Sequence, residues 1–308
     1  MTPKERAIAA LELRQPDDIV PTFELEFQLS QELFGTDFVS THNLTGADLD
    51  RAVAHNAELH VRIAETLDYS IIRTGDINVL RRLAKDGVGR RYLLCGEADG
   101  TMAIPTGQNM VEVSARLFEH PDEVKQELDR AADAAIEWGR QQIEAGAECL
   151  TMCADYCFNQ GPFLSPPMFA EFVTPYLHRI VEAHKANGAY VIKHTDGNIM
   201  PILDQLVAAG PNGLHSLDPQ AGVDIAEVKR LYGDRICLCG NVNCGKLQTG
   251  TDEEVIQDAI YSITHGKPGG GYIFCTSNVA FKGMELRRYM MILEVRQKYG
   301  RYDQPNQT

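Results

Sequence analysis

The chain has 308 residues and a formal net charge of −14, with 44% hydrophobic and 23% charged residues. This acidity, with no run rich in Lys and Arg, argues against a nucleic-acid-binding protein and disfavours a polyanionic substrate. No apolar stretch approaches the roughly 20 residues that span a bilayer, so we expect no membrane partner. The length suffices to bury one large core and no linker interrupts it, which predicts a single domain over residues 1–308.

The first residues, "MTPKERAIAALELRQPDD", have the pattern of an amphipathic helix with Thr2 as its N-cap and Pro3 at its first position. Glu5 and Glu12 interrupt the apolar pattern, which is not that of a signal peptide. In a long chain of this kind the usual state of cysteine is a reduced thiol. The eight cysteines therefore indicate a cytoplasmic protein.

Up to Gly188 the sequence mixes strand patterns with helical ones. Strand-like patterns cover residues 19–27, 69–74 and 147–155, and residues 90–107 predict a hairpin that turns at Asp99 and Gly100. Helical patterns run from Gly46 to about Leu67, from Pro121 to about Ala145, and from Ser165 to about Asn187.

Beyond Gly188 the alternation becomes regular, because each short apolar strand is followed by one helix that ends at a glycine. The predicted strand and helix pairs are 190–195 with 199–209, 213–217 with 224–232, 235–240 with 251–265, and 271–276 with 284–299. This pattern is typical of parallel strands covered by helices. About eight strand candidates and no GxGxxG motif predict an α/β fold, a (β/α)8 barrel with an N-terminal helical extension.

Polar residues collect where the predicted strands end, and barrel enzymes hold their active sites at that end of the strands. We predict that Asp155, His194 and Asp196 are catalytic. The residues predicted to bind substrate from the following strand ends are His215, Asn241 and Asn278.

The stretch "VIKHTDGNIMP" (191–201) places His194 and Asp196 two residues apart at a strand end, which puts both side chains on one face. This spacing suits a pair of metal ligands, or a base with the acid that orients it. It also suits a histidine that is merely hydrogen-bonded beside an Asp-Gly turn.

Two further pairs have the same spacing. In "FELEF" (23–27), Glu24 and Glu26 share a face opposite the apolar residues, where they either bind substrate inside the mouth or lie solvated on its rim. Cys237 and Cys239 form a second i, i+2 pair. Zinc ligation by thiolates and burial in a strand are the two alternatives for this pair, and no CxxC spacing favours zinc.

Several long stretches resemble the uroporphyrinogen decarboxylase superfamily. They are the opening "MTPKERAIAALELRQPDDIVPT", then "GPFLSPPMFAEFVTPYLHRIVEAHKANGAYVIKHTDGN", "LDPQAGVDIAEVKRLYGDRICLCGNVN" and "PGGGYIFCTSN". The resemblance covers most of the chain and implies a (β/α)8 barrel. It also implies one of two chemistries, cofactor-free decarboxylation of uroporphyrinogen or methyl transfer to or from a corrinoid protein.

The departures from the superfamily's motifs favour methyl transfer. The decarboxylases have an arginine-rich RQAGRY segment after the first strand, where this chain reads "FELEFQLSQELFG" (23–35), without arginine. The thiol-methylating members have His-x-Cys where this chain has His194-Thr195-Asp196, and their further cysteine falls at about Asn278. The resemblance therefore implies that His194 is a metal ligand. The two cysteine ligands of those members have no counterpart in this chain.

We expect zinc bound by His194 and Asp196, because nitrogen and oxygen ligands make a harder Lewis acid than thiolates and suit an oxygen-bound methyl group. The resemblance then implies a corrinoid-dependent methyltransferase that demethylates a small methoxylated or similar donor. The alternative is a decarboxylase-like lyase acting on another substrate. The chain shows no cobalamin-binding module, so a separate cobalamin-binding protein is the expected partner, and a homodimer is the expected assembly.

Overall fold

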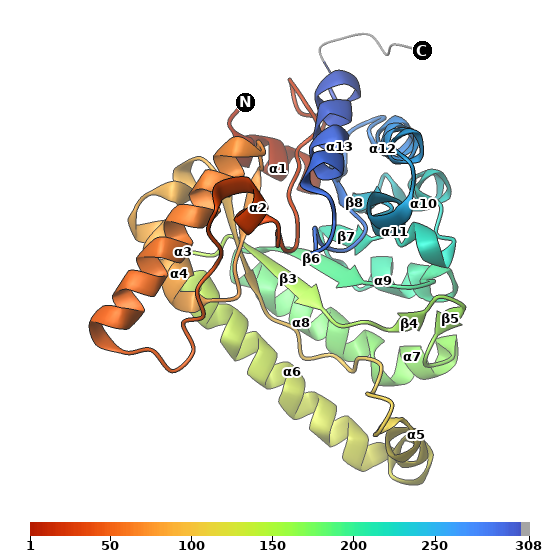
Figure 1. Cartoon of the computed structure of the whole chain (residues 1–308). Coiled ribbons are helices and arrows are strands. Elements are labelled where there is room, and N and C mark those ends of the chain that lie inside the picture. Colours follow the sequence, from red (N-terminus) through yellow and green to blue (C-terminus); the bar gives the residue numbers. More distant parts are fainter. Residues whose placement is uncertain (303–308) are drawn as a thin grey trace.

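The computed structural model describes residues 1–302. Its centre is a curled sheet of seven parallel strands in the order β1-β2-β3-β6-β7-β8-β9 (Figure 1). Their bounds are β1 Ile71–Arg73, β2 Leu93–Glu97, β3 Cys149–Cys153, β6 Tyr190–Thr195, β7 Gly213–Ser216, β8 Cys237–Val242 and β9 Tyr272–Thr276. A separate antiparallel pair consists of β4 Cys157–Phe158 and β5 Gly161–Pro162.

The extended segment 19–27 joins the two edges of this sheet. The Phe274 amide of β9 donates to the Pro21 carbonyl at 2.9 Å, and the Ser70 amide, just before β1, donates to the Thr22 carbonyl at 2.7 Å. Thr22 pairs with Phe274 through an isolated bridge, not a continuous ladder. The segment predicted as the first strand thus takes the eighth position, and the predicted barrel fold is confirmed.

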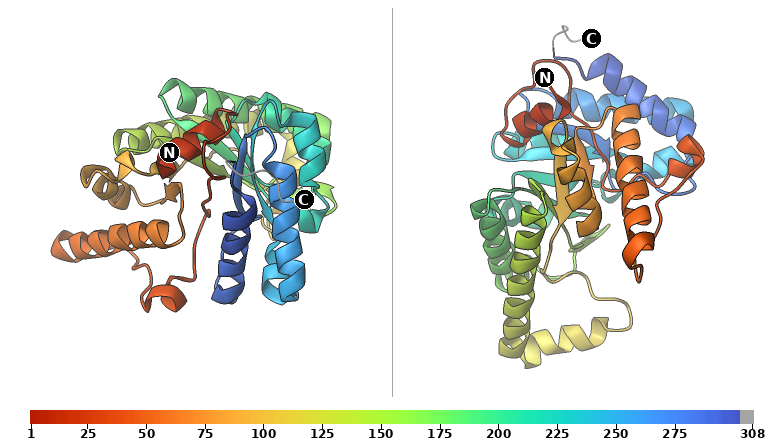
Figure 2. Two further views of the ribbon diagram at one scale, coloured as in Figure 1. Left: turned by 90° about the horizontal axis from the view of Figure 1, so that it is seen from above. Right: turned by 90° about the vertical axis from the view of Figure 1, so that its left-hand side faces the viewer.

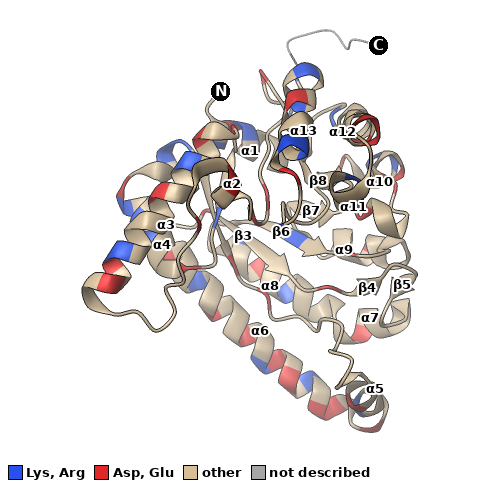
Figure 3. Ribbon diagram, in the orientation of Figure 1, with Lys and Arg blue, Asp and Glu red and all other residues tan. Residues whose placement is uncertain are grey.

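Helices cover the outside of the sheet, as the two views in Figure 2 show. Their bounds are α1 Pro3–Leu11, α2 Ser30–Phe34, α3 Gly46–Thr66, α4 Ile77–Lys85, α5 Met110–Glu119, α6 Pro121–Glu144, α7 Pro166–Phe172, α8 Thr174–Ala186, α9 Leu203–Ala208, α10 Ile225–Tyr232, α11 Cys244–Thr249, α12 Asp252–Gly266 and α13 Leu286–Tyr299. Lys and Arg alternate with Asp and Glu on outer helices such as α6 (Figure 3). Within residues 1–302 no helix is both long and apolar enough to cross a membrane.

The predicted N-terminal helix is α1, and it plugs the barrel. Thr2 and Glu5 form a reciprocal capping box at its start, with Pro3 in the first turn. Ala7, Ala10 and Leu11 pack in one cluster with the inward side chains of the strands. That cluster includes the buried Cys95, Cys149, Cys237, Cys239 and Cys275, and all eight cysteines are free. The lower barrel is therefore an apolar core.

Two predictions about secondary structure are wrong. The hairpin at 90–107 does not form, because β2 pairs in parallel with both β1 and β3, and the chain after Glu97 leaves the sheet. A side chain at Gly100 would lie 2.4 Å from the Ala131 carbonyl oxygen of α6, so this glycine serves close packing. The helix predicted from Ser165 to Asn187 is split into α7 and α8, because Pro175 has no N–H to continue it.

A largely buried ion pair ties β6 to the segment after β2. The Lys193 ammonium lies 2.8 Å from the Asp99 carboxylate and also donates to the carbonyls of Met152 and Ala154. Burial works against ionisation of Asp99, but the charge and hydrogen bonds of Lys193 outweigh it and leave the pKa of Asp99 below its usual value. The charged pair is therefore retained inside the protein.

Glu24 of the segment 19–27 is also buried, on the side facing α13. Its carboxylate accepts from the Thr276 amide at 3.1 Å, from the Thr276 hydroxyl at 2.5 Å and from the Tyr289 hydroxyl at 3.2 Å. Burial raises the pKa of Glu24 to about 8, although these three donors favour the ionised form.

Asp99→Asn should destabilise the protein by about 3–5 kcal/mol, because it leaves the Lys193 ammonium buried without its counter-charge. Urea unfolding of wild type and variant measures the difference. The matched control is Glu137→Gln on α6, which removes one partner of an exposed ion pair with Arg140 and should cost less than about 1 kcal/mol. A cost for Asp99→Asn as small as the control's would contradict the role assigned to this pair.

Glu24→Gln should change how stability depends on pH. In wild type the unfolded carboxyl ionises above its ordinary pKa of 4.5, while the folded one keeps its proton up to about pH 8. Stability from this group is thus fully present at low pH and falls by about 1.4 kcal/mol per pH unit between about pH 5 and 8. The amide of the variant does not ionise, so its stability does not fall in this way. The stability of the variant relative to wild type should therefore rise as the pH increases from about 5 to 8. Parallel stability curves would show that Glu24 ionises normally.

Candidate functional site

Three ligand-type side chains converge where β3 and β6 end. In the register of the sheet, Cys153 of β3 lies opposite His194 of β6, which lies opposite His215 of β7. Ile192 points into the barrel core, so His194 and Asp196, two and four residues on, face the mouth above it. His194 Nε2 lies 3.7 Å from Asp155 Oδ1 and 3.8 Å from Asp196 Oδ1. Asp155, His194 and Asp196, whose ligand atoms all lie within 4.8 Å of one another, are called the carboxylate–histidine cluster below.

The imidazole of His194 is neutral and its orientation is fixed. Its Nδ1 lies 2.9 Å from Nδ1 of His215, a contact in which one ring donates and the other accepts. Burial, with smaller effects of the Lys193 and Arg73 charges, lowers the pKa of His194 to about 3. Desolvation and two nearby cations outweigh the carboxylates.

Asp196 is held by donors from the ends of two other strands, β7 and β9. The Ser216 hydroxyl donates to one carboxylate oxygen at 2.6 Å, and the Asn278 amide donates to the other at 2.5 Å. The Asp196 backbone amide donates to Asp155 Oδ1 at 2.9 Å. Burial raises the pKa of Asp196 to about 7, and the charges of Asp155 and Asp218 act in the same direction. Two adjacent carboxyl groups with no cation in contact favour the binding of a cation.

The structure thus brings together five of the residues predicted from the sequence: Asp155, His194, Asp196, His215 and Asn278. Asn241 lies elsewhere. Its side chain donates to the Leu217 carbonyl at 2.9 Å and accepts from Ser262 of α12, so it faces outward. Cys237 and Cys239 point into the barrel, and a regular strand would point Asn241 inward as well. The strand becomes irregular at Gly240, whose φ of 146° is a conformation that favours glycine.

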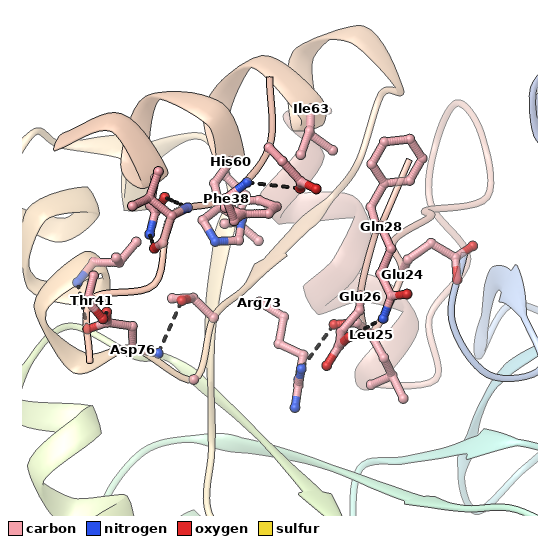
Figure 4. Close-up of a pocket in the computed structure, with 18 of the residues that line it drawn as sticks. Glu24, Leu25, Glu26, Gln28, Phe38, Thr41, His60, Ile63, Arg73 and Asp76 are labelled. Atoms are coloured by element: carbon pink, nitrogen blue, oxygen red, sulfur yellow. Dashed lines mark hydrogen bonds between the residues drawn. The ribbon is translucent and has the colours of Figure 1, made fainter. Parts of the chain in front are cut away.

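Neither glutamate of "FELEF" belongs to the cluster. Glu24 is buried against Thr276 and Tyr289, and Glu26 is exposed and accepts from Gln28 at 2.7 Å. Both line a different cavity of about 590 Å³, shown in Figure 4. A cavity of about 280 Å³ lies beside Asp196 and Asn278.

Arg73 is a residue that the sequence analysis missed. It lies at the end of β1, where its side chain donates to the Leu25 carbonyl and to Thr151 Oγ1, each at 3.0 Å, and pairs with Glu97. Its guanidinium is 3.8 Å from the Cys153 sulfur, next to His194 in the register. In the sequence, only its position at the end of a predicted strand pointed to Arg73.

The one cysteine pair considered as zinc ligands forms no such site. Cys237 and Cys239 are fully buried in the barrel core. In the part of the chain that the structure describes, the carboxylate–histidine cluster is the group of three or more His, Cys, Asp or Glu side chains that could hold a metal ion.

Solved structures share this fold. A methyltransferase from Methanosarcina mazei superposes with a TM-score of 0.77 at 18% identity, covering 97% of this chain and 99% of that one. A B12-independent methionine synthase from Shewanella sp. W3-18-1 superposes with a TM-score of 0.58 at 11% identity, over 91% and 97% of the two chains. At these identities the likeness concerns the fold alone.

Sequence comparisons place the chain in a family. Residues 82–299 match the model of the uroporphyrinogen decarboxylase family. The uroporphyrinogen decarboxylase of Pseudoalteromonas translucida is 26% identical over 170 residues, 53% of this chain and 45% of its own length. That of Photobacterium profundum is 25% identical over 216 residues, 64% and 56% of the two chains. The chain aligns with about half the length of these relatives, and because the family model matches well over half of it, the protein belongs to the uroporphyrinogen decarboxylase family.

Proposed function

We propose that the protein is a methyltransferase that removes the methyl group of a small methoxylated or similar donor and passes it to a cobalamin-binding partner protein. The observation that carries the proposal is the carboxylate–histidine cluster, which lies where barrel enzymes hold their catalytic groups. The fold shared with the methyltransferase from Methanosarcina mazei supports it.

The cluster fits a zinc ion by the chemistry and spacing of its donors. Zinc binds neutral imidazole nitrogen and carboxylate oxygen at roughly 2.0–2.2 Å in a tetrahedral arrangement, so two of its ligand atoms lie about 3.3–3.6 Å apart. His194 Nε2 lies 3.7 and 3.8 Å from the two carboxylates, so a small inward shift of the side chains would bring the three donors to this spacing. Zinc bound there supplies a Lewis acid for the oxygen that carries the methyl group.

The neighbouring residues prepare these donors. His215 engages Nδ1 of His194 and leaves its Nε2 directed at the carboxylates. Ser216 and Asn278 hold the two oxygens of Asp196, so its carboxylate keeps one orientation. No thiol takes part in the cluster, and this all nitrogen and oxygen set favours an oxygen-bound methyl group over a thiol substrate.

A decarboxylase-like lyase acting on another substrate is the second candidate, because the curated relatives are named uroporphyrinogen decarboxylases. The segment 23–35 argues against uroporphyrinogen itself. It contains Glu24, Glu26 and Glu32 and no arginine, so it offers the carboxylates of that substrate no partner. Release of carbon dioxide without any transfer of methyl to a corrinoid would favour the lyase.

His194→Ala should abolish methyl transfer and remove bound zinc, because it deletes the nitrogen ligand while leaving the barrel core intact. Zinc per chain is measured by elemental analysis, and transfer by the absorbance change of cob(I)alamin with a panel of methoxylated aromatics. His178→Ala, on the exposed face of α8, is the matched control and should match wild type in both. A folded His194→Ala protein that demethylates at a rate near wild type would end the proposal.

A further inference from the structure

The cavity of Figure 4 has about twice the volume of the one beside Asp196, about 590 against 280 Å³. Its volume falls in the range of roughly 300–1,000 Å³ that takes small molecules. Its walls come from the segments 24–28 and 37–42, from α3, and from the end of β1 with the following loop. Apart from Lys282, every lining residue precedes residue 82, where the family match begins. The cavity is thus built by the part of the chain outside that match.

Much of the wall is apolar or aromatic. The residues that give it this character are Phe27, Phe38, Ile63, Tyr69, Ile71, Ile72 and Val79. The Phe38 ring contacts the His60 ring with 4.5 Å between centroids and 43° between the ring planes, so these two side chains add adjoining aromatic rings to the wall. Such a lining favours a ligand with a flat apolar body.

The Lys and Arg side chains of the wall are already paired. Arg73 is paired with Glu97, and Lys282 lies 2.8 Å from Asp37. Asp76 caps the N-terminus of α4, and Glu26 forms no ion pair with a Lys or Arg within residues 1–302. A carboxylate or phosphate entering here would meet carboxylates and no unpaired Lys or Arg side chain, so the cavity disfavours anions.

His60 of α3 is a polar group of the wall with spare hydrogen-bonding capacity. Its half-buried ring has no hydrogen-bond partner among the described residues, whereas nearby Asn56 is fully engaged with the Val39 backbone. Burial, with a smaller effect of Arg73, lowers the pKa of His60 to about 4. The ring is therefore neutral at pH 7 and offers one donor and one acceptor.

The cavity adjoins the catalytic mouth. Leu25 and Ile71 line the cavity and also belong to the barrel core. Arg73 lines it too and contacts Cys153, which lies opposite His194 in the register. The cavity and the carboxylate–histidine cluster are thus linked through the contacts of Arg73 and Cys153.

We infer that this cavity binds the uncharged aromatic ring of the substrate, with His60 hydrogen-bonded to an oxygen substituent of that ring. This deepens the proposed function and rests on it only for the ligand's identity as the methyl donor. The geometry assigns His60 as a binding residue, and the paired charges of the wall make the site select neutral phenols over aromatic carboxylates.

Isothermal titration calorimetry of the full chain, without any corrinoid partner, tests the inference. The probes are 2-methoxyphenol and its carboxylated analogue 4-hydroxy-3-methoxybenzoate. We expect the phenol to bind at least about tenfold more tightly than the carboxylate, and His60→Ala to weaken phenol binding by about tenfold or more, because a polar contact in a buried pocket is lost. His60→Gln, which keeps a donor and an acceptor, should recover part of the affinity.

His178→Ala is the control of matched residue type and should bind like wild type. Ile63→Phe, which fills the cavity from α3, should also prevent binding and serves if His60→Ala does not fold. Equal affinity of wild type and both cavity variants, or tighter binding of the carboxylate, would overturn the inference. Phenol binding that depends on His60, without any methyl transfer, would support the cavity assignment and contradict the proposed function instead.

Discussion

The register of β3, β6 and β7 is the constraint on which the rest of the site depends. It sets Cys153, His194 and His215 side by side on the inner face. A slip of β6 by one residue would turn His194 and Asp196 outward and Lys193 inward. On the outer face, Lys193 donates to the carbonyls of Met152 and Ala154 and pairs with Asp99. The buried ion pair and the carboxylate–histidine cluster are thus the two faces of one strand, and the first helps to fix the second.

Charge divides the mouth into two regions of different chemistry. At the cluster, a neutral His194 and two neighbouring carboxylates lack a cation, and burial raises the pKa of Asp196 to about 7. A cation bound beside Asp196 would stabilise its ionised form and so oppose this rise in pKa. In the cavity beyond Arg73, the basic side chains are already paired and His60 is neutral. Such a division suits a substrate whose reactive oxygen faces a metal while its body stays uncharged.

Local pattern sufficed for the regular half of the barrel, from β6 onward, because each strand there is short, apolar and followed by a helix ending near a glycine. The i, i+2 spacing also paired His194 with Asp196 correctly. The sequence predictions failed where a contact between distant parts of the chain determines where a side chain points. Asn241 faces Ser262 because the alternation breaks at Gly240, and Glu24 is held by Thr276, 252 positions away. No local pattern shows that Arg73 reaches Leu25 and Thr151.

We propose that the protein holds a metal through nitrogen and oxygen donors alone, and X-ray absorption at the zinc edge of the purified, zinc-loaded protein measures those donors. We expect nitrogen and oxygen at about 2.0–2.2 Å from the metal, and loss of this signal in the Asp196→Asn, His194→Ala double variant. Sulfur at about 2.3 Å would instead assign the metal to cysteines, and a spectrum unchanged by the double variant would place the metal at another site. Either result would contradict the proposed metal site.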